Sequence, residues 1–151
     1  RTLKTGAAVK KVLVARATGY LGRFVVREFK ERGYWVRALT RDEDRLRQAG
    51  PFTAPSIGDE GVDEVFDGEL TDPSTLAGLM DGIDIVFSSV GISRQRDGLT
   101  FEQVDYQCNH TLIGMAIESG VQKFVYVSMQ GADKSEIADL AITRAHEKVV
   151  D

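Results

Sequence analysis

The sequence is poor in the residues that mark several classes of protein. Only one of its 151 residues is a cysteine, Cys108, so no disulfide can form within the chain, which fits a reducing compartment. Cysteine and the two histidines show no metal-ligand spacing, and no nucleophile has a general base in its sequence context. The sequence therefore predicts neither a metal site nor a hydrolase of the triad type.

Long apolar runs and an excess of positive charge are also lacking. No uninterrupted apolar run approaches the roughly 20 residues that a membrane-spanning helix requires. The formal net charge is −4 with acidic and basic residues interspersed, so no basic face for nucleic acid is predicted. Residues 1–10 are basic but have no apolar core of signal-peptide length, and we expect a flexible lead-in. Together these features favour a cytoplasmic protein.

The sequence does contain a regular alternation of apolar strands and helical patterns. Apolar residues make up 42% of the chain, which is typical of a globular domain. Strand patterns occur around residues 12–15, 34–40, 65–66, 83–89 and 123–128. This order predicts an α/β fold, a Rossmann-type doubly wound parallel sheet with strand order 3-2-1-4-5, over residues 11–151.

Helical patterns separate the expected strands. After residue 20, Leu21, Val25 and Phe29 form one apolar stripe, which Phe24 and Val26 widen and which leaves Arg23 and Arg27 outside. We expect further helices over 42–48, after Asp72-Pro73, from Thr100 to Gly120 and over 135–150. The last pattern reaches Asp151 without a stop signal. We therefore expect either an incomplete C-terminus without its substrate lobe, or a homodimer through the exposed edge of the sheet.

The first strand and helix are joined by a glycine-containing turn. A dinucleotide-binding turn has the pattern G-x-x-G-x-x-G, in which Gly19 and Gly22 occupy the last two places and Arg16 the first. Glycine at 19 lets a pyrophosphate approach the backbone, and glycine at 22 lets helix and strand pack closely. The two glycines can also serve turn geometry alone. Arg16 either obstructs the phosphate path, contacts a phosphate, or points to solvent.

Several segments carry a resemblance to a known family. They are VLVARATGYLG, VRALTRDEDRL, DGELTDPSTL, GIDIVFSSVG and VDYQCNHTLIGMAIESGVQKFVYVS. With these segments the chain resembles the short-chain dehydrogenase/reductase superfamily, in particular its extended and atypical branches and the NmrA-like NAD(P)-binding proteins. The resemblance covers nearly the whole chain in the family's order. It implies a dinucleotide as the cofactor and leaves the small-molecule substrate unknown.

The resemblance also implies which residues bind the cofactor. The expected contacts to the pyrophosphate, the adenosine and the rest of the dinucleotide are Arg16, Ala17, Thr18, Gly19, Tyr20, Leu21, Gly22, Arg41, Glu69, Leu70, Val90 and Gly91. Arg41 follows the second strand, where an arginine pairs with the 2′-phosphate of NADP and an acidic residue holds the 2′-hydroxyl of NAD. The sequence thus favours NADP over NAD. The alternative is a surface arginine paired with Asp42 or Asp44.

The reaction is less defined than the cofactor. The family's serine position holds Ser128, the candidate catalytic residue, and its helix asparagine is Asn109. The family's Tyr-x-x-x-Lys pair, a general acid/base with its pKa-lowering lysine, is absent from the helix LAITRAHEKVV, in which His146 lies. Two functions remain open. One is an NADP-binding oxidoreductase or cofactor-sensing module, and the other is a degenerate Rossmann-fold interaction domain that Arg16 prevents from binding dinucleotide.

Overall fold

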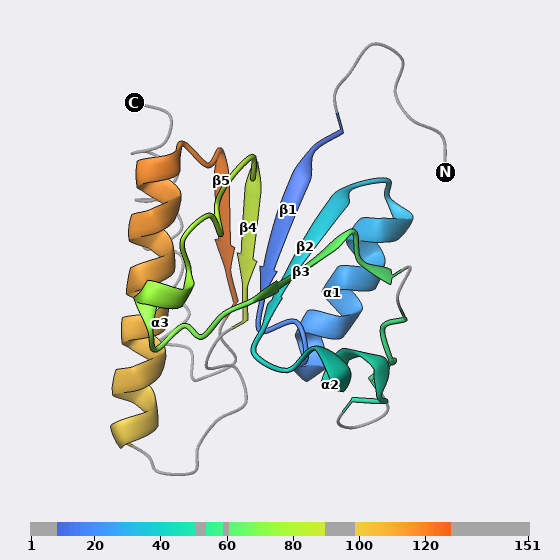
Figure 1. Cartoon of the computed structure of the whole chain (residues 1–151), viewed down its shortest axis with the longest axis horizontal. Helices are drawn as coiled ribbons and strands as arrows, with labels where there is room; N and C mark the ends of the chain where they lie inside the picture. The colour runs from blue at the N-terminus through green and yellow to red at the C-terminus, as the bar shows by residue number, and fades with distance from the viewer. Residues whose placement is uncertain (1–8, 51–53, 59–60, 90–98, 128–151) are drawn as a thin grey trace.

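The computed structural model describes residues 9–50, 54–58, 61–89 and 99–127 (Figure 1). Within these residues five strands and three α-helices follow one another, with a short 3₁₀ helix before the fourth strand. In chain order these are β1 (Lys11–Ala15), α1 (Tyr20–Glu31), β2 (Trp35–Thr40), α2 (Glu43–Arg47), β3 (Glu64–Asp67), η3 (Pro73–Thr75), β4 (Ile85–Ser88), α3 (Leu99–Ser119) and β5 (Lys123–Tyr126).

The strands form one parallel sheet in the order β3-β2-β1-β4-β5, which confirms the predicted Rossmann-type topology. Its first crossovers place β2 and β3 on one side of β1, and the chain then returns to place β4 and β5 on the other side. Ala15 at the end of β1 lies opposite Leu39 of β2 and Ser88 of β4. The carboxyl ends of these strands therefore share one edge, and the order reverses beside β1.

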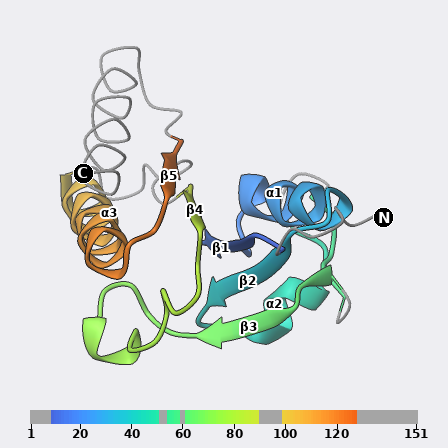
Figure 2. The ribbon, with the colours of Figure 1, turned by 90° about the horizontal axis from the view of Figure 1, so that it is seen from above.

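Both faces of the sheet are buried, as the continuous apolar strands predict. Val12 and Val14 of β1 point to the face that α1 and α2 cover, and Leu13 and Ala15 point to the face that α3 covers. Figure 2 shows α1 and α2 on one side of the sheet and α3 on the other. Leu112 of α3 and Phe124 of β5, which are 0% and 1% exposed, lie in the same core cluster as Leu13 and Ala15. The helices on the two faces thus bury the apolar side chains of the central strand β1 completely.

Three local predictions are wrong. Arg23, expected outside the buried stripe of α1, is only 2% exposed, whereas Phe24, expected within it, is 37% exposed. The proline after Asp72 begins the short η3 and not an α-helix. Gly78 and Gly82 have positive φ angles of 85° and 72°, so this segment turns repeatedly instead of continuing as a helix.

Other expected elements agree in place with small shifts of boundary. Helix α3 ends at Ser119 and is followed by Gly120, whose φ is 76°. It begins at Leu99, so Thr100 lies inside the helix and not at its cap. The expected helix over 135–150 lies outside the described residues.

Candidate functional site

The turn between β1 and α1 is tight and packs closely against β2 and the start of α1. Arg16 has a φ of 58°, a left-handed conformation that costs an L-residue about 1–2 kcal/mol. The next residue, Ala17, is completely buried and its N–H donates to the carbonyl of Leu39 at 3.5 Å. A Cβ on Gly22 would overlap the carbonyl oxygen of Arg16. Glycine at 22 is therefore required by the close approach of helix and turn.

The side chain of Arg16 lies along this turn. Its Cγ and Cδ are 3.4 and 3.6 Å from the place that a Cβ on Gly19 would occupy. The residue is half-buried. The aliphatic part of the Arg16 side chain thus covers the side of Gly19 where a side chain would stand. This places a cationic residue within the turn itself.

The first turn of α1 provides a setting for an anion. Helix α1 begins at Tyr20, and its N-cap, Gly19, offers no side-chain hydrogen bond to the first N–H groups. No acidic residue lies in the first turn. Backbone N–H groups at a helix N-terminus, together with the helix dipole, stabilise a negatively charged group. Because the strand order reverses beside β1, this helix end lies where such sheets bind ligands.

Arg23, the fourth residue of α1, links the turn between β1 and α1 to the segment after β2. Its guanidinium donates to five backbone carbonyls, including that of Thr18 at 2.8 Å and that of Pro55 at 3.1 Å. The other three belong to residues 45, 46 and 48, at the C-terminal end of α2. Burial, and next the charge of Arg45, lower the pKa of Arg23, yet an arginine remains charged at neutral pH. Gly50 leaves room for it, since a Cβ there would lie 2.5 Å from Cδ of Arg23.

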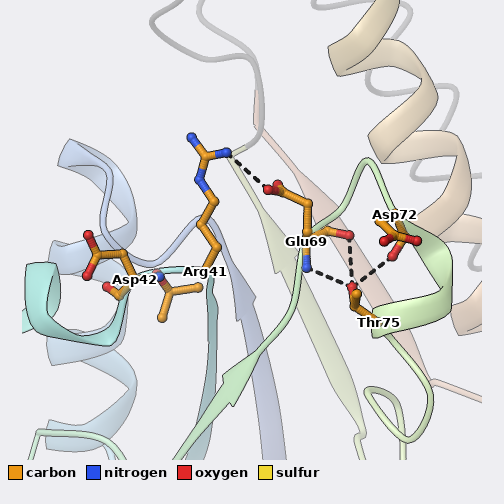
Figure 3. Close-up of polar contacts among 6 residues, drawn as sticks. Arg41, Asp42, Glu69, Asp72 and Thr75 are labelled. Atoms are coloured by element: carbon orange, nitrogen blue, oxygen red, sulfur yellow. Dashed lines mark hydrogen bonds and ion pairs between the residues drawn. The ribbon is translucent and has the colours of Figure 1, made fainter.

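Arg41 lies directly after β2, at the same edge. Its Nη1 is 3.0 Å from a carboxylate oxygen of Glu69, which follows β3 (Figure 3). The side chain of Arg41 is 72% exposed and that of Glu69 37% exposed. Among the described residues the partner of this arginine is therefore Glu69, and the alternative pairing with Asp42 or Asp44 is wrong. Leu70 turns the other way and packs against the core beneath α3.

The carboxyl end of β4 carries small polar side chains. Ser88 is completely buried, and its hydroxyl donates to Oδ1 of Asn109 in α3 at 2.7 Å. The neighbouring Ser89 is 1% exposed, and its hydroxyl bonds to none of the residues that the structure describes. The expected site residues Val90, Gly91 and Ser128, as well as His146, lie outside the described residues.

The structure thus brings the turn residues, Arg41 and Glu69 to one edge of the sheet. The expectation did not include Arg23 or the pairing of Arg41 with Glu69. The positions of Arg41 and Glu69, each just after one of two neighbouring strands, were an available indication that the two side chains lie close together, whereas helical periodicity assigned Arg23 to solvent. Within the described ranges no helix is long and apolar enough to cross a membrane, and no cluster of three or more possible ligands could hold a metal ion.

The chain is similar in sequence to several known proteins and in fold to several solved structures. The photosystem II assembly factor Ycf39 of Synechocystis is 30% identical over 91% of this chain, which covers 40% of that protein. The 3β-hydroxysteroid dehydrogenase/Δ5→4-isomerase of Mycobacterium tuberculosis is 30% identical over 78% of this chain and 31% of its own length. The crystal structure of the Bordetella bronchiseptica enzyme WbmG in complex with NAD superposes with a TM-score of 0.61, at 17% identity, over 82% of this chain and 39% of that one.

The chain thus spans at most about two fifths of the length of these proteins. The family model that matches is described as the NmrA-like family, and the match extends over residues 8–149. The parallel sheet in the order 3-2-1-4-5 and the glycine turn at its switch point are consistent with this match. The chain therefore belongs to the NmrA-like family, in the atypical branch of the short-chain dehydrogenase/reductase superfamily.

Proposed function

We propose that the chain is an NADP-binding module of an oxidoreductase or of a cofactor-sensing protein. The observation that carries this proposal is the glycine turn at the N-terminus of α1, which lies at the switch point of the sheet and has no acidic side chain in its first turn. A dinucleotide pyrophosphate would bind across this turn. WbmG, which has the same fold, binds NAD, and the Mycobacterium tuberculosis relative is named as a dehydrogenase.

Arg41 supports NADP as the preferred cofactor. It is an exposed cation that follows β2, two residues beyond Leu39, whose carbonyl accepts the N–H of Ala17 in the turn. A ribose whose pyrophosphate lies on the turn would have its 2′ position near the end of β2. A guanidinium there pairs with a 2′-phosphate by charge-assisted hydrogen bonds, which are worth roughly 1.5–3 kcal/mol.

Calorimetric titration with NADP⁺ and NAD⁺ tests this function. The expected result is tighter binding of NADP⁺, and Arg41→Ala should weaken NADP⁺ binding roughly tenfold to a hundredfold while changing NAD⁺ binding little. Arg27→Ala, which removes an exposed arginine of α1, serves as the matched control. Equal affinities for the two cofactors in the unmodified chain would contradict the NADP preference.

The conformation of Arg16 favours a second candidate, an interaction domain that no longer binds dinucleotide. Its stem lies against Gly19, on the turn that would hold the pyrophosphate. If the side chain obstructs the turn, Arg16→Gly should create or tighten dinucleotide binding, and it should also relieve the cost of the left-handed backbone. Weaker binding in Arg16→Gly would instead identify the guanidinium as a phosphate ligand and exclude this candidate.

A further inference from the structure

The Arg41–Glu69 ion pair lies where the two cofactors differ chemically. NADP carries a phosphate on the 2′ oxygen of its adenosine ribose, and NAD carries a hydroxyl there. In this chain the arginine that would bind the phosphate already has an anionic partner, with 3.0 Å between Nη1 and Oε2 of Glu69. Two anions would therefore compete for one guanidinium.

The backbone on both sides of this pair is held in place. On the β2 side, the buried hydroxyl of Thr40 accepts the N–H of Asp42 at 3.0 Å, so the residue between them is fixed in a tight turn. On the β3 side, the N–H of Glu69 donates to the hydroxyl of Thr75 at 2.9 Å, and the carbonyl of Glu69 accepts the N–H of Asp72 at 2.9 Å. Figure 3 shows Asp72 and Thr75 next to Glu69, and Asp42 next to Arg41.

Strand pairing sets the distance between the two turns. Thr40 lies opposite Asp67, and the N–H of Gly68 donates to the carbonyl of Thr40 at 3.2 Å. A Cβ on Gly68 would lie 3.0 Å from Leu76 and 3.3 Å from Leu39, so the chain passes close to the core there. Strand pairing and the two turns therefore hold the backbones of Arg41 and Glu69 next to each other.

The other charges near Arg41 are already paired or point elsewhere. Glu43 and Asp44, in the first turn of α2, both pair with Arg47 of the same helix, at 3.0 and 3.3 Å. In Figure 3 the carboxylate of Asp42 lies on the side of Arg41 away from Glu69. Because the side chains of Arg41 and Glu69 are 72% and 37% exposed, a ligand can reach the pair, and solvent weakens but does not abolish the interaction of Glu69 with an arriving phosphate.

We infer that Glu69 is a specificity-determining residue, which lowers the preference for NADP over NAD by competing with the 2′-phosphate for Arg41 and by repelling it. This inference rests on the proposed function, since it assumes that a dinucleotide binds at this edge. A 2′-phosphate replaces or shares the bond to Nη1, whereas a 2′-hydroxyl leaves the ion pair intact. NAD binding is then insensitive to the charge of residue 69.

The test compares Glu69→Gln with the unmodified chain by calorimetry, using NADP⁺ and NAD⁺. Glu69→Gln should tighten NADP⁺ binding about twofold to fivefold and leave NAD⁺ binding nearly unchanged. The gain should diminish at high salt, because both side chains are exposed. Glu28→Gln is the matched control: it removes the same charge from an exposed ion pair, with Arg32, at the other end of α1, and should leave both affinities unchanged.

The double variant Arg41→Ala/Glu69→Gln measures whether the two residues act on each other. Most of the gain from Glu69→Gln should disappear when Arg41 is already alanine. An unchanged ratio of the two affinities in Glu69→Gln, with Arg41→Ala still losing NADP⁺, would overturn the inference and leave the proposed function intact. Weaker NADP⁺ binding in Glu69→Gln would also overturn it, because Glu69 would then orient Arg41 for the phosphate. Binding of neither cofactor to any of these proteins would reject the proposed function and this inference with it.

Discussion

Arg23 is a buried cation whose hydrogen-bond partners in the described chain are backbone carbonyls rather than carboxylates. Its five acceptors come from the turn before α1, the end of α2 and the segment at Pro55. Carbonyl groups at a helix C-terminus have no partner within the helix, so one planar guanidinium satisfies several at once. The same contacts join the candidate phosphate turn to the segment that follows Arg41.

Replacing Arg23 should therefore cost more than replacing an ordinary helix arginine. Arg23→Met keeps most of the apolar stem but leaves the carbonyls without a donor, and we expect the free energy of unfolding to fall by at least about 3 kcal/mol. Arg27→Met, one turn further along α1 and exposed, should change it by less than about 0.5 kcal/mol. Urea denaturation of the two variants measures the difference. Equal stability would show that water replaces the guanidinium without loss.

The elements of the fold were largely predictable, whereas individual side-chain environments were not. Parallel strands buried on both faces have largely apolar sequences, so β1, β2, β4 and β5 could be located from runs of apolar residues along the chain. The segment after Asp72 has the cap and the apolar residues of a helix, but glycines with positive φ at 78 and 82 interrupt it. Here backbone geometry, which periodicity does not report, decided the structure.

In the candidate site, too, the positions of the segments were predictable and the side-chain contacts were not. The resemblance and the strand ends place the turn and Arg41 at one edge, because all parallel strands end there. The partner of Arg41 depends on how far a side chain on the next strand reaches, and the burial of Arg23 depends on a carbonyl cluster assembled from three segments. Such long-range polar contacts leave no periodic signal in a single sequence.

At the scale of the helix, replacing two glycines by alanine should have opposite effects on stability. Gly22→Ala would place a methyl group against the carbonyl oxygen of Arg16, so the turn must separate from α1. We expect a loss of about 1–3 kcal/mol of stability and weaker dinucleotide binding. Gly114→Ala, inside α3, would place its Cβ more than 4 Å from every described atom outside the neighbouring helix backbone, and should instead gain about 0.5–1 kcal/mol and leave binding unchanged.

Thermal or urea denaturation, together with a cofactor titration, separates the two substitutions. Stabilisation by both would mean that the approach of the turn to α1 relaxes without loss. Destabilisation by Gly114→Ala would show that α3 has a neighbour at that position beyond the described residues.

At the scale of the whole molecule, the candidate site exists only when the chain is folded. The turn after β1, Arg41 and Glu69 follow three different strands and meet through the pairing of β1, β2 and β3. In the described sheet β3 and β5 are the outer strands. That the edge at β5 is covered by a second copy or by further chain stays a prediction, which light scattering of the intact protein can test.

Because the site is assembled by folding, a bound dinucleotide should stabilise the entire domain. A ligand that binds only the folded state adds about 2.7 kcal/mol at a concentration 100 times its Kd. For a chain of this length that corresponds to a rise in Tm of roughly 5–10 °C. At equal concentrations NADP⁺ should raise Tm more than NAD⁺, and Arg41→Ala should remove the difference without removing the common part of the shift, which comes from the turn. The absence of a shift with either cofactor would instead favour the interaction domain, in which Arg16 closes the turn.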